Sequence, residues 1–342
     1  MAKQKRGTRS ILFDAPPILT AWASVAGKKE SEGPLQAYFD YTNGDTYFGE
    51  KTWEKAECHM QEIALETLLQ KAGKKKQDVD LVFSGDLLNQ CISSSFSLRN
   101  TGLPALGLYG ACSTMGESLL LASMAVSGGF ADQAVAMTSS HFCSAERQYR
   151  NPLEYGGQKP PTAQWTTTGS GAVILSRKGT GPFITHVTTG KVVDKGITDA
   201  NNMGAAMAPA AYATLHAHFE ETGRSPDFYD LIVTGDLGSL GKEIVTDFFQ
   251  RDGIDLRGRY DDCGVLLFDP TTQDVHAGGS GCGCSAVVLT GHLLREMRRG
   301  TYRNLLFCGT GALHSPTATM QGESIPGICH AVAITTEKGG AS

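Results

Sequence analysis

The chain has 342 residues, 41% hydrophobic and 19% charged, a composition typical of a folded protein with a sizeable core. Its formal net charge of −5 argues against nucleic-acid binding, which depends on a basic surface. The nine cysteines are scattered and none forms a CxxC pair, which favours free thiols over a disulfide framework or a zinc site. We therefore expect no nucleic-acid partner and no metal ligands.

The first segment of the chain is basic and then apolar, as a signal peptide would be. Residues 1–9 carry the positive charges, but Asp14, Pro16 and Pro17 interrupt the apolar stretch of residues 10–27. No run approaches the about 18 apolar residues that a membrane span requires. We expect a first strand here, in a soluble protein with neither a signal peptide nor a transmembrane segment.

The next two elements follow from periodicity and from glycine positions. Residues 52–73 carry apolar side chains at helical spacing and end at Gly73, which predicts an amphipathic helix. Residues 78–88 contain a short apolar run that ends at Gly85 and Asp86, which predicts a buried strand.

A repeat relates the two halves of the chain. The pattern Asp-Leu-(Val/Ile)-(Phe/Val)-(Ser/Thr)-Gly-Asp-Leu begins at Asp80 and again at Asp230. Cys112 and Cys284 are each followed by serine, each opens a helical stretch, and each has a glycine sixteen residues further on. We infer that one strand–helix unit is used twice.

The repeat defines the expected architecture. We place an N-terminal half at residues 1–178 and a C-terminal half at residues 179–342. Strands that alternate with helices through short glycine turns predict an α/β fold with βαβ-rich halves. Two such halves packed together give a five-layer α/β/α/β/α sandwich.

Cys112 lies where a predicted strand passes into a predicted helix. Gly110 and Ala111 close the strand, and Ser113 or Thr114 begins a helix of small and apolar residues. Free backbone N–H groups and the positive end of the helix dipole lie beside such a cysteine. This environment lowers the pKa of a thiol and attracts anionic ligands. The alternative is a buried cysteine that packs as a small apolar side chain.

Segments from both halves carry a family resemblance: DLLNQ (86–90), GACST (110–114), TSSH (138–141), AERQYRNPLEYGGQKP (145–160), TGSGAVILS (168–176), GKVVDKGITD (190–199), MGAAMAPAA (203–211), TGDLG (234–238), AGGSGCGCSAVV (277–288) and TGALHSPT (310–317). On these segments the chain resembles the thiolase and β-ketoacyl synthase superfamily over nearly its whole length. Within that superfamily it is closely similar to the stage V sporulation protein AD family of spore-forming bacteria. The resemblance implies the thiolase-like fold.

In condensing enzymes of the superfamily the cysteine after the strand is acylated. Two partners from the C-terminal half, a histidine with a second histidine, an asparagine or a cysteine, support the thiolate and the enolate. Cys112 matches the nucleophile, but residues 234–236 read Thr-Gly-Asp and residues 279–281 read Gly-Ser-Gly where the partners are expected. His276 and His314 lie near these loops in the sequence and are either substitutes or structural histidines. The resemblance therefore implies a protein that is not an enzyme, with Cys112 as a vestigial nucleophile.

The family resemblance also implies a ligand and a setting. The SpoVA apparatus moves dipicolinic acid, as its calcium chelate, into the developing spore and out again at germination. We expect dipicolinate as the ligand and no other cofactor. The expected ligand-binding residues surround the Cys112 turn and the corresponding loops of the second half: Asp86, Asn89, Cys112, Ser113, Thr114, His141, Asp236 and Ser280.

Two of these residues are carboxylates with an alternative role. Asp86 and Asp236 are related by the repeat and follow strands, at the edge where α/β sheets bind ligands. Their oxygens suit the calcium of a chelate, whereas the alternative for each is to cap a turn. The loop within residues 145–160 carries Arg147, Arg150 and Lys159 and could cover the pocket.

Other functions remain open at this point. A β-ketoacyl synthase III-like acyltransferase would use Cys112 on an acyl thioester, and a structural scaffold would bind no ligand. The expected partners are dipicolinate and other SpoVA proteins, which would hold the chain at the spore inner membrane. Homodimerisation through the face that carries the Cys112 unit is common in this fold.

Overall fold

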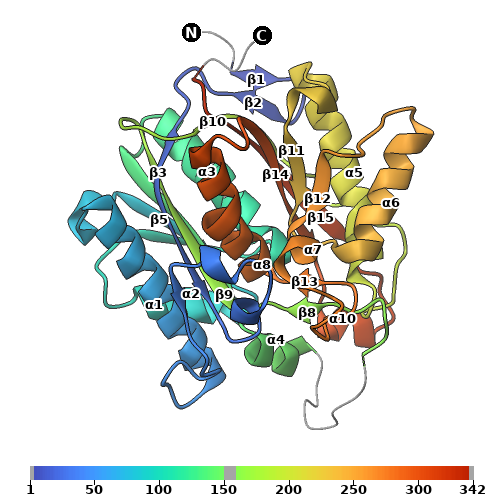
Figure 1. The fold of residues 1–342 in the computed structure, drawn as a ribbon, viewed down its shortest axis with the longest axis horizontal. Helices are drawn as coiled ribbons and strands as arrows, with labels where there is room; N and C mark the ends of the chain where they lie inside the picture. Colours follow the sequence, from blue (N-terminus) through green and yellow to red (C-terminus); the bar gives the residue numbers. More distant parts are fainter. Residues whose placement is uncertain (1–3, 150–158, 339–342) are drawn as a thin grey trace.

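The computed structural model describes residues 4–149 and 159–338. Most of its strands form one mixed sheet with two arms (Figure 1), and two short strands, Trp165–Thr166 and Gly279–Ser280, pair in a separate sheet. The strands of the first arm, in spatial order, are β3 (Ile18–Ala26), β9 (Gly169–Ser176), β7 (Gln133–Ser140), β5 (Leu81–Gly85) and β6 (Ala105–Leu108). Those of the second arm are β10 (Phe183–Thr188), β15 (Gly327–Thr335), β14 (Asn304–Ala312), β11 (Leu231–Thr234) and β12 (Tyr260–Asp262).

The two arms have the same pairing pattern. β9 runs antiparallel to β3 and β7, and β5 and β6 continue parallel to β7. β15 likewise runs antiparallel to β10 and β14, and β11 and β12 continue parallel to β14. A single residue pair, Phe183 with Ile18, joins the arms. The strands that begin next to Asp80 and Asp230, β5 and β11, occupy equivalent places.

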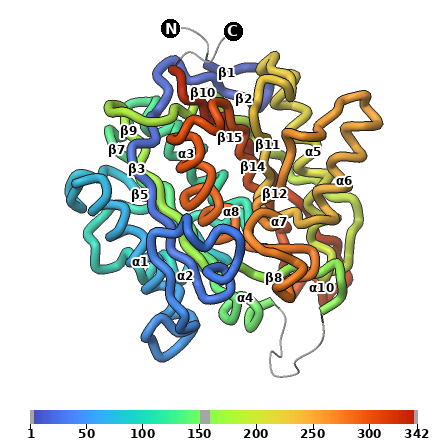
Figure 2. Tube along the Cα trace, in the orientation of Figure 1, coloured from blue at the N-terminus to red at the C-terminus, as the bar shows by residue number. Residues whose placement is uncertain are grey.

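Helices cover and separate the arms. α1 (Trp53–Ala72) packs on β3, β9 and β7, and α5 (Met203–Thr222) packs on β15, β14 and β10. α3 (Thr114–Ser127) contacts β5 and β7 of one arm and β14 and β15 of the other, with α8 (Cys282–Val287) beside it. In Figure 2 the blue-to-green half lies mainly on the left and the yellow-to-red half mainly on the right, with the orange-red segment that contains α8 in the centre. The predicted five-layer α/β/α/β/α sandwich is confirmed.

The local predictions for the first elements also agree with the structure. Thr52 accepts a hydrogen bond from the Lys55 N–H at the start of α1, and Gly73 ends the helix in the left-handed conformation. The remaining helices and strands are β1 (Lys5–Arg6), β2 (Ser10–Leu12), β4 (Tyr41–Thr42), α2 (Ile92–Leu98), α4 (Phe142–Tyr149), β8 (Trp165–Thr166), α6 (Gly238–Arg251), α7 (Cys263–Leu267), β13 (Gly279–Ser280), a π-helical turn (Val288–Leu293), α9 (Leu294–Arg299) and α10 (Pro316–Met320). Across the described residues, we find no helix with the length and apolar character of a membrane span.

Glycines allow the backbones of the two halves to touch where α3 begins. A Cβ atom added to Gly309 on β14 would lie 2.8 Å from the carbonyl oxygen of Ser113 and 2.9 Å from Cα of Gly116. A Cβ atom on Gly311 would lie 2.6 Å from the carbonyl oxygen of Gly110. Because main-chain atoms cannot give way as side chains can, this contact requires glycine.

We expect Gly309→Ala to lower the free energy of unfolding by about 1–3 kcal/mol, the usual cost of overpacking a core. Urea denaturation followed by circular dichroism measures the loss. Gly44→Ala is the matched control, because nothing lies within 4 Å of the added methyl group at that exposed position. Equal stability of the two variants would contradict a rigid backbone contact.

Candidate functional site

The predicted strand-to-helix turn is present at Cys112. Ala111 has a φ of +51°, a left-handed conformation that is strained for a residue with a side chain. The Ser113 hydroxyl donates to the Gly110 carbonyl (2.6 Å), and the Thr114 hydroxyl donates to the Ala111 carbonyl (2.6 Å). Ser113 and Thr114 are fully buried. Both side chains therefore hold the turn in shape and are absent from the lining of the cavity beside it.

Cys112 borders a small cavity between the two halves. Its volume is about 40 Å³, close to the space that one water molecule occupies in the liquid. Among the residues predicted to bind ligand, Cys112 and Ser280 line it. The full lining comprises Leu87, Ala111, Cys112, Ala145, Glu146, Tyr149, Thr166, Met203, Ser280, Ala312 and His314. In this conformation the cavity is too small for an aromatic dicarboxylate.

Asp236 lies behind the cavity wall and contacts the thiol of Cys112. Its carboxylate accepts hydrogen bonds from the Gly281 N–H (2.8 Å), the Thr310 hydroxyl (2.9 Å) and the Ser280 hydroxyl (3.3 Å). The Cys112 thiol lies close enough to this carboxylate for each group to affect the pKa of the other. Burial raises the pKa of Asp236 to about 6, against the lowering effect of these hydrogen bonds.

The thiol of Cys112 is held in its neutral form. Burial, and then the negative charge of Asp236, raise the pKa of this thiol well above its ordinary value. The expectation that the helix start lowers the thiol pKa is therefore wrong. The side chain is only 6% exposed, and a carboxylate next to it opposes a second negative charge. The same neighbours disfavour a nucleophilic thiolate near neutral pH.

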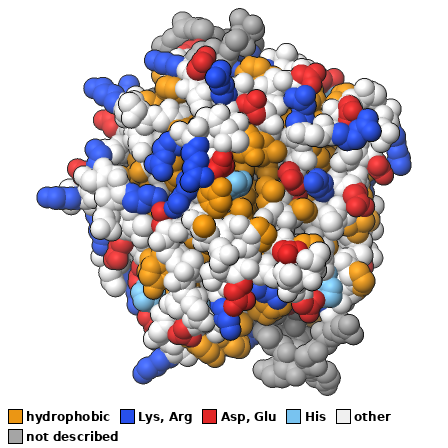
Figure 3. Space-filling model, viewed as in Figure 1, with side chains coloured by type: hydrophobic (Ala, Val, Ile, Leu, Met, Phe, Trp, Pro, Cys, Tyr) orange, Lys and Arg blue, Asp and Glu red, His pale blue; other side chains and the backbone are white. Residues whose placement is uncertain are grey.

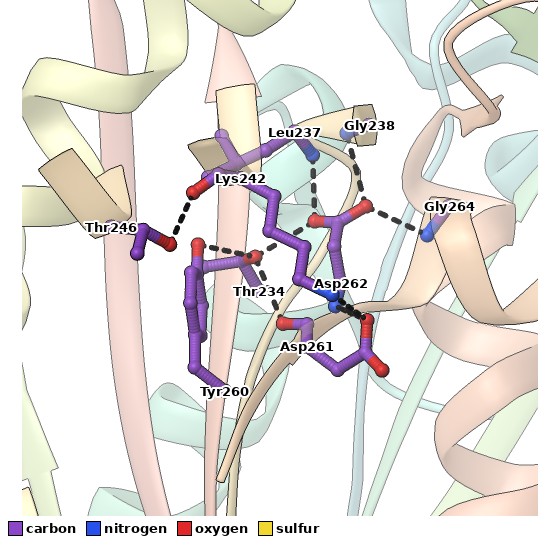
Figure 4. Close-up of polar contacts among 9 residues, drawn as sticks. All are labelled: Thr234, Leu237, Gly238, Lys242, Thr246, Tyr260, Asp261, Asp262 and Gly264. Carbon is purple, nitrogen blue, oxygen red and sulfur yellow. Dashed lines mark hydrogen bonds and ion pairs between the residues drawn. The ribbon is translucent and has the colours of Figure 1, made fainter. Parts of the chain in front are cut away.

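A second buried carboxylate, Asp262, fixes the loop that carries Asp236 (Figure 4). It accepts four hydrogen bonds: from the Thr234 hydroxyl (2.8 Å), Leu237 N–H (2.8 Å), Gly238 N–H (3.0 Å) and Gly264 N–H (2.9 Å). Burial raises the pKa of Asp262 to about 7. Because two of its donors directly follow Asp236 in the chain, Asp262 holds the Asp236 loop against β12.

Asp86, the repeat partner of Asp236, is turned away from the cavity. Its carboxylate accepts from the Leu88 N–H (2.9 Å) and from both the N–H and the hydroxyl of Ser94 (2.8 Å each), so it supports the start of α2. Glu57 on α1 lies close by. Burial, and then the charge of Asp86, raise the pKa of Glu57 to about 8. Within residues 4–149 and 159–338, no group of three or more His, Cys, Asp or Glu side chains is arranged to hold a metal ion.

His141 and Asn89 also lie outside the cavity lining. The Cys143 N–H donates to Nδ1 of His141 (3.1 Å), so Nε2 carries the proton and donates to the Thr46 carbonyl (2.8 Å). His141 is 1% exposed, and burial lowers its pKa. Asn89 is exposed, and its backbone N–H donates to Oε1 of Gln148 (3.0 Å). Both residues serve the local structure around α4.

α4 and β8 bring further side chains to the cavity, and of these only Tyr149 is a ligand candidate from the sequence. Glu146 and Tyr149 come from α4, and Thr166 comes from β8. The Tyr149 hydroxyl donates to the Leu87 carbonyl (2.6 Å), which ties the end of α4 across the cavity. The segment 145–160 was singled out as a cover, but its residues 150–158, including Arg150, lie outside those the structure describes.

These features define the class of the protein as thiolase-like, with a cysteine at the start of the central helix. 3-Oxoacyl-[acyl-carrier-protein] synthase III from Aquifex aeolicus VF5 is 12% identical with a TM-score of 0.57, and the alignment covers 93% of this chain and 99% of that one. A histidine-to-asparagine variant of OleA from Xanthomonas campestris is 14% identical with a TM-score of 0.60, and the alignment covers 95% and 99%. At these identities the likeness establishes the fold alone.

The chain belongs to the stage V sporulation protein AD family. The sequence model of that family, SpoVAD, matches residues 7–335. Stage V sporulation protein AD of Bacillus subtilis (strain 168) is 46% identical over 336 residues, which cover 98% of this chain and 99% of that protein. The resemblance drawn from the sequence is confirmed, and sporulation is the process to which the chain belongs.

We expect Asp236→Asn to lower the pKa of the Cys112 thiol, because the substitution removes the adjacent negative charge and keeps a similar shape. Alkylation of Cys112 by iodoacetamide, followed by peptide mass spectrometry from pH 7 to 9, should be at least several-fold faster in the variant. Cys143 is the internal control, because it is half-buried and its raised pKa follows from burial and Glu146. If Cys112 and Cys143 are each alkylated at the same rate in the variant as in the wild type, burial alone sets the pKa of the Cys112 thiol.

Proposed function

We propose that this protein is a non-enzymatic ligand-binding subunit of the SpoVA apparatus and that its ligand is calcium dipicolinate, bound at the Cys112 cavity. The observation that carries the proposal is the burial of the Cys112 thiol beside the Asp236 carboxylate, which raises the pKa of the thiol. Thioester chemistry requires a thiolate, and this pair disfavours one. On this proposal the cavity between the two halves binds a ligand, and the uncharged Cys112 side chain forms part of its lining.

The charges around the cavity favour the calcium chelate over the free dianion. Glu146 lines the cavity, Asp236 lies behind Ser280, and Lys159 forms an ion pair with Glu146 (2.9 Å). A dianion placed among these carboxylates is repelled, whereas the chelate is neutral. Calcium also accepts further oxygen ligands, which a carboxylate such as that of Glu146 supplies.

Ligand entry requires α4 to move, since the cavity has a volume of only about 40 Å³. The Leu87 carbonyl accepts hydrogen bonds from the hydroxyls of Tyr149 (2.6 Å) and Tyr109 (3.2 Å) and from Nε2 of Gln148 (3.1 Å). Each such bond contributes about 1 kcal/mol net. Breaking these contacts therefore costs a few kcal/mol at most, well within the binding free energy of a micromolar ligand.

We expect calorimetric titration to detect calcium dipicolinate binding to the wild type and weaker binding of dipicolinate in excess chelator. Glu146→Gln should weaken the affinity for the calcium form by about tenfold, through the loss of one charged calcium contact. Glu243→Gln, at an exposed position on α6, is the matched control. A folded wild type that binds neither form at millimolar concentration would exclude the proposed ligand.

An acyltransferase is the second candidate, favoured by the strained turn at Ala111 and by the fold shared with 3-oxoacyl synthase III. Incubation with acyl-CoA distinguishes the two candidates. Our proposal expects no acyl mass on Cys112, and a stoichiometric acyl adduct would replace it with the acyltransferase. The absence of both an adduct and ligand binding would favour a scaffold.

We also propose that other SpoVA proteins bring the chain to the spore inner membrane and that two copies pair through β6. β6 has β5 as its one neighbour in the described sheet, so its outer edge is free. Leu106 on this strand is 51% exposed and Tyr109 beside it 46%. An apolar free edge is a pairing surface.

Leu106→Lys should shift the protein from dimer to monomer, because it places a charge on the pairing edge. Mass photometry or sedimentation measures the shift. Val192→Lys, at a position 60% exposed on another surface, should leave the assembly unchanged. A monomeric wild type, or dissociation in both variants, would contradict pairing through β6.

A further inference from the structure

A basic channel crosses the end of the molecule opposite the Cys112 cavity. Two depressions, of about 900 Å³ and about 530 Å³, share Thr20 and Thr180 in their walls and therefore lie next to each other. They meet at the connection between β9 and β10, residues 177–182. We call these two adjoining depressions together the hairpin channel. It borders the start of β7 at Gln133, whereas the Cys112 cavity lies beyond the other end of that strand.

The lining of the hairpin channel is strongly cationic. It includes six basic side chains, namely Lys71, Lys74, Arg177, Lys178, Arg298 and Lys338, and one acidic side chain, Asp132. The whole chain carries a net charge of −5, so the positive charge of the channel is a local feature of this surface. Lys and Arg side chains gather on the upper left of the face in Figure 3.

Most of these cations lack a carboxylate that neutralises them. Lys71 pairs with Asp40 (2.8 Å) and Arg177 with Asp132 (3.2 Å). Over residues 4–149 and 159–338, no ion pair involves Lys74, Lys178 or Lys338. The guanidinium of Arg298 lies over the Trp22 ring, 5.3 Å from its centre. The channel is therefore built to face an anion.

An exposed aromatic residue lies in a loop whose neighbouring residues line the channel. Phe130 is 85% exposed and follows two glycines in the connection between α3 and β7. The channel-lining residues Val126 and Asp132 flank this connection on either side. An exposed phenylalanine beside a cluster of cations is the combination by which peripheral proteins insert into an anionic lipid surface.

We propose that the hairpin channel and Phe130 form a binding surface for anionic phospholipid headgroups. The cations contact lipid phosphates, and the phenyl ring enters the boundary between headgroups and acyl chains. An acidic protein segment would satisfy the charges but would leave Phe130 unexplained. This surface is separate from the Cys112 cavity, and its test needs no dipicolinate, so either proposal can fail without the other.

The test is co-sedimentation of the full chain with vesicles of phosphatidylglycerol mixed with phosphatidylcholine, and with vesicles of phosphatidylcholine alone. We expect binding to the anionic vesicles only, weakened by salt. Reversal of three unpaired cations, K74E/K178E/R298E, should lower partitioning by more than about 100-fold, since each basic residue near an anionic surface contributes roughly fivefold and the new carboxylates are repelled. The control K55E/K195E/R251E changes the net charge equally at exposed positions outside the channel.

A second readout isolates the aromatic residue. Phe130→Trp should give a blue shift of tryptophan fluorescence with anionic vesicles and none with phosphatidylcholine, and Phe130→Ser should weaken partitioning several-fold. No sedimentation of the wild type at low salt would overturn the proposal, as would equal losses in the two triple variants. Binding of a polyglutamate peptide by a protein that ignores the vesicles would assign the channel to an acidic protein partner instead.

Discussion

The backbone contact between α3 and β14 is the constraint on which the site depends. Because Gly309 and Gly311 carry no side chains, β14 approaches the start of α3 until main-chain atoms meet. Thr310, between these glycines, donates its hydroxyl proton to Asp236. The contact therefore places a side chain of the second half against the Cys112 turn of the first. A larger residue at either glycine would separate the thiol from the carboxylate.

The chemistry of the site follows from which group faces the cysteine. A helix start contributes about 1 kcal/mol to an adjacent anion, rarely 2. Complete burial and a neighbouring carboxylate each act against an anion, and burial is the larger cause for Cys112. One turn geometry can thus present either a thiolate or a neutral thiol. In this chain Asp236, positioned by Asp262, favours the neutral thiol of Cys112 over the thiolate.

The fold could be predicted from the sequence because the same strand–helix pattern occurs in both halves of the chain. The patterns at Asp80 and Asp230 became equivalent strands, and Cys112 does lie at a strand-to-helix turn. The site could be predicted only in part. A sequence shows that Asp86 follows a strand, but not that its carboxylate turns back to the N–H groups of Leu88 and Ser94.

No repeat or motif in the sequence places α4 in the wall of the cavity. Glu146 and Tyr149 reach the cavity because a short helix docks across the carboxyl end of β5, a tertiary contact between segments about sixty residues apart. Local periodicity reports which face of a helix is apolar, but not where that helix docks. The raised pKa of the Cys112 thiol has no local signal either, because it depends first on burial between the two halves and then on Asp236, which is distant in sequence.

The two proposed surfaces lie at opposite ends of β7. That strand has eight residues, so its ends are roughly 25 Å apart. If the hairpin channel rests on lipid headgroups, the Cys112 cavity opens well above the bilayer, on the side where α4 lies. Calcium dipicolinate would then reach the cavity from the aqueous phase or from a partner that contacts α4, and not directly from the lipid. In that arrangement the proposed ligand site would lie beside the membrane, about the length of β7 away from the lipid surface.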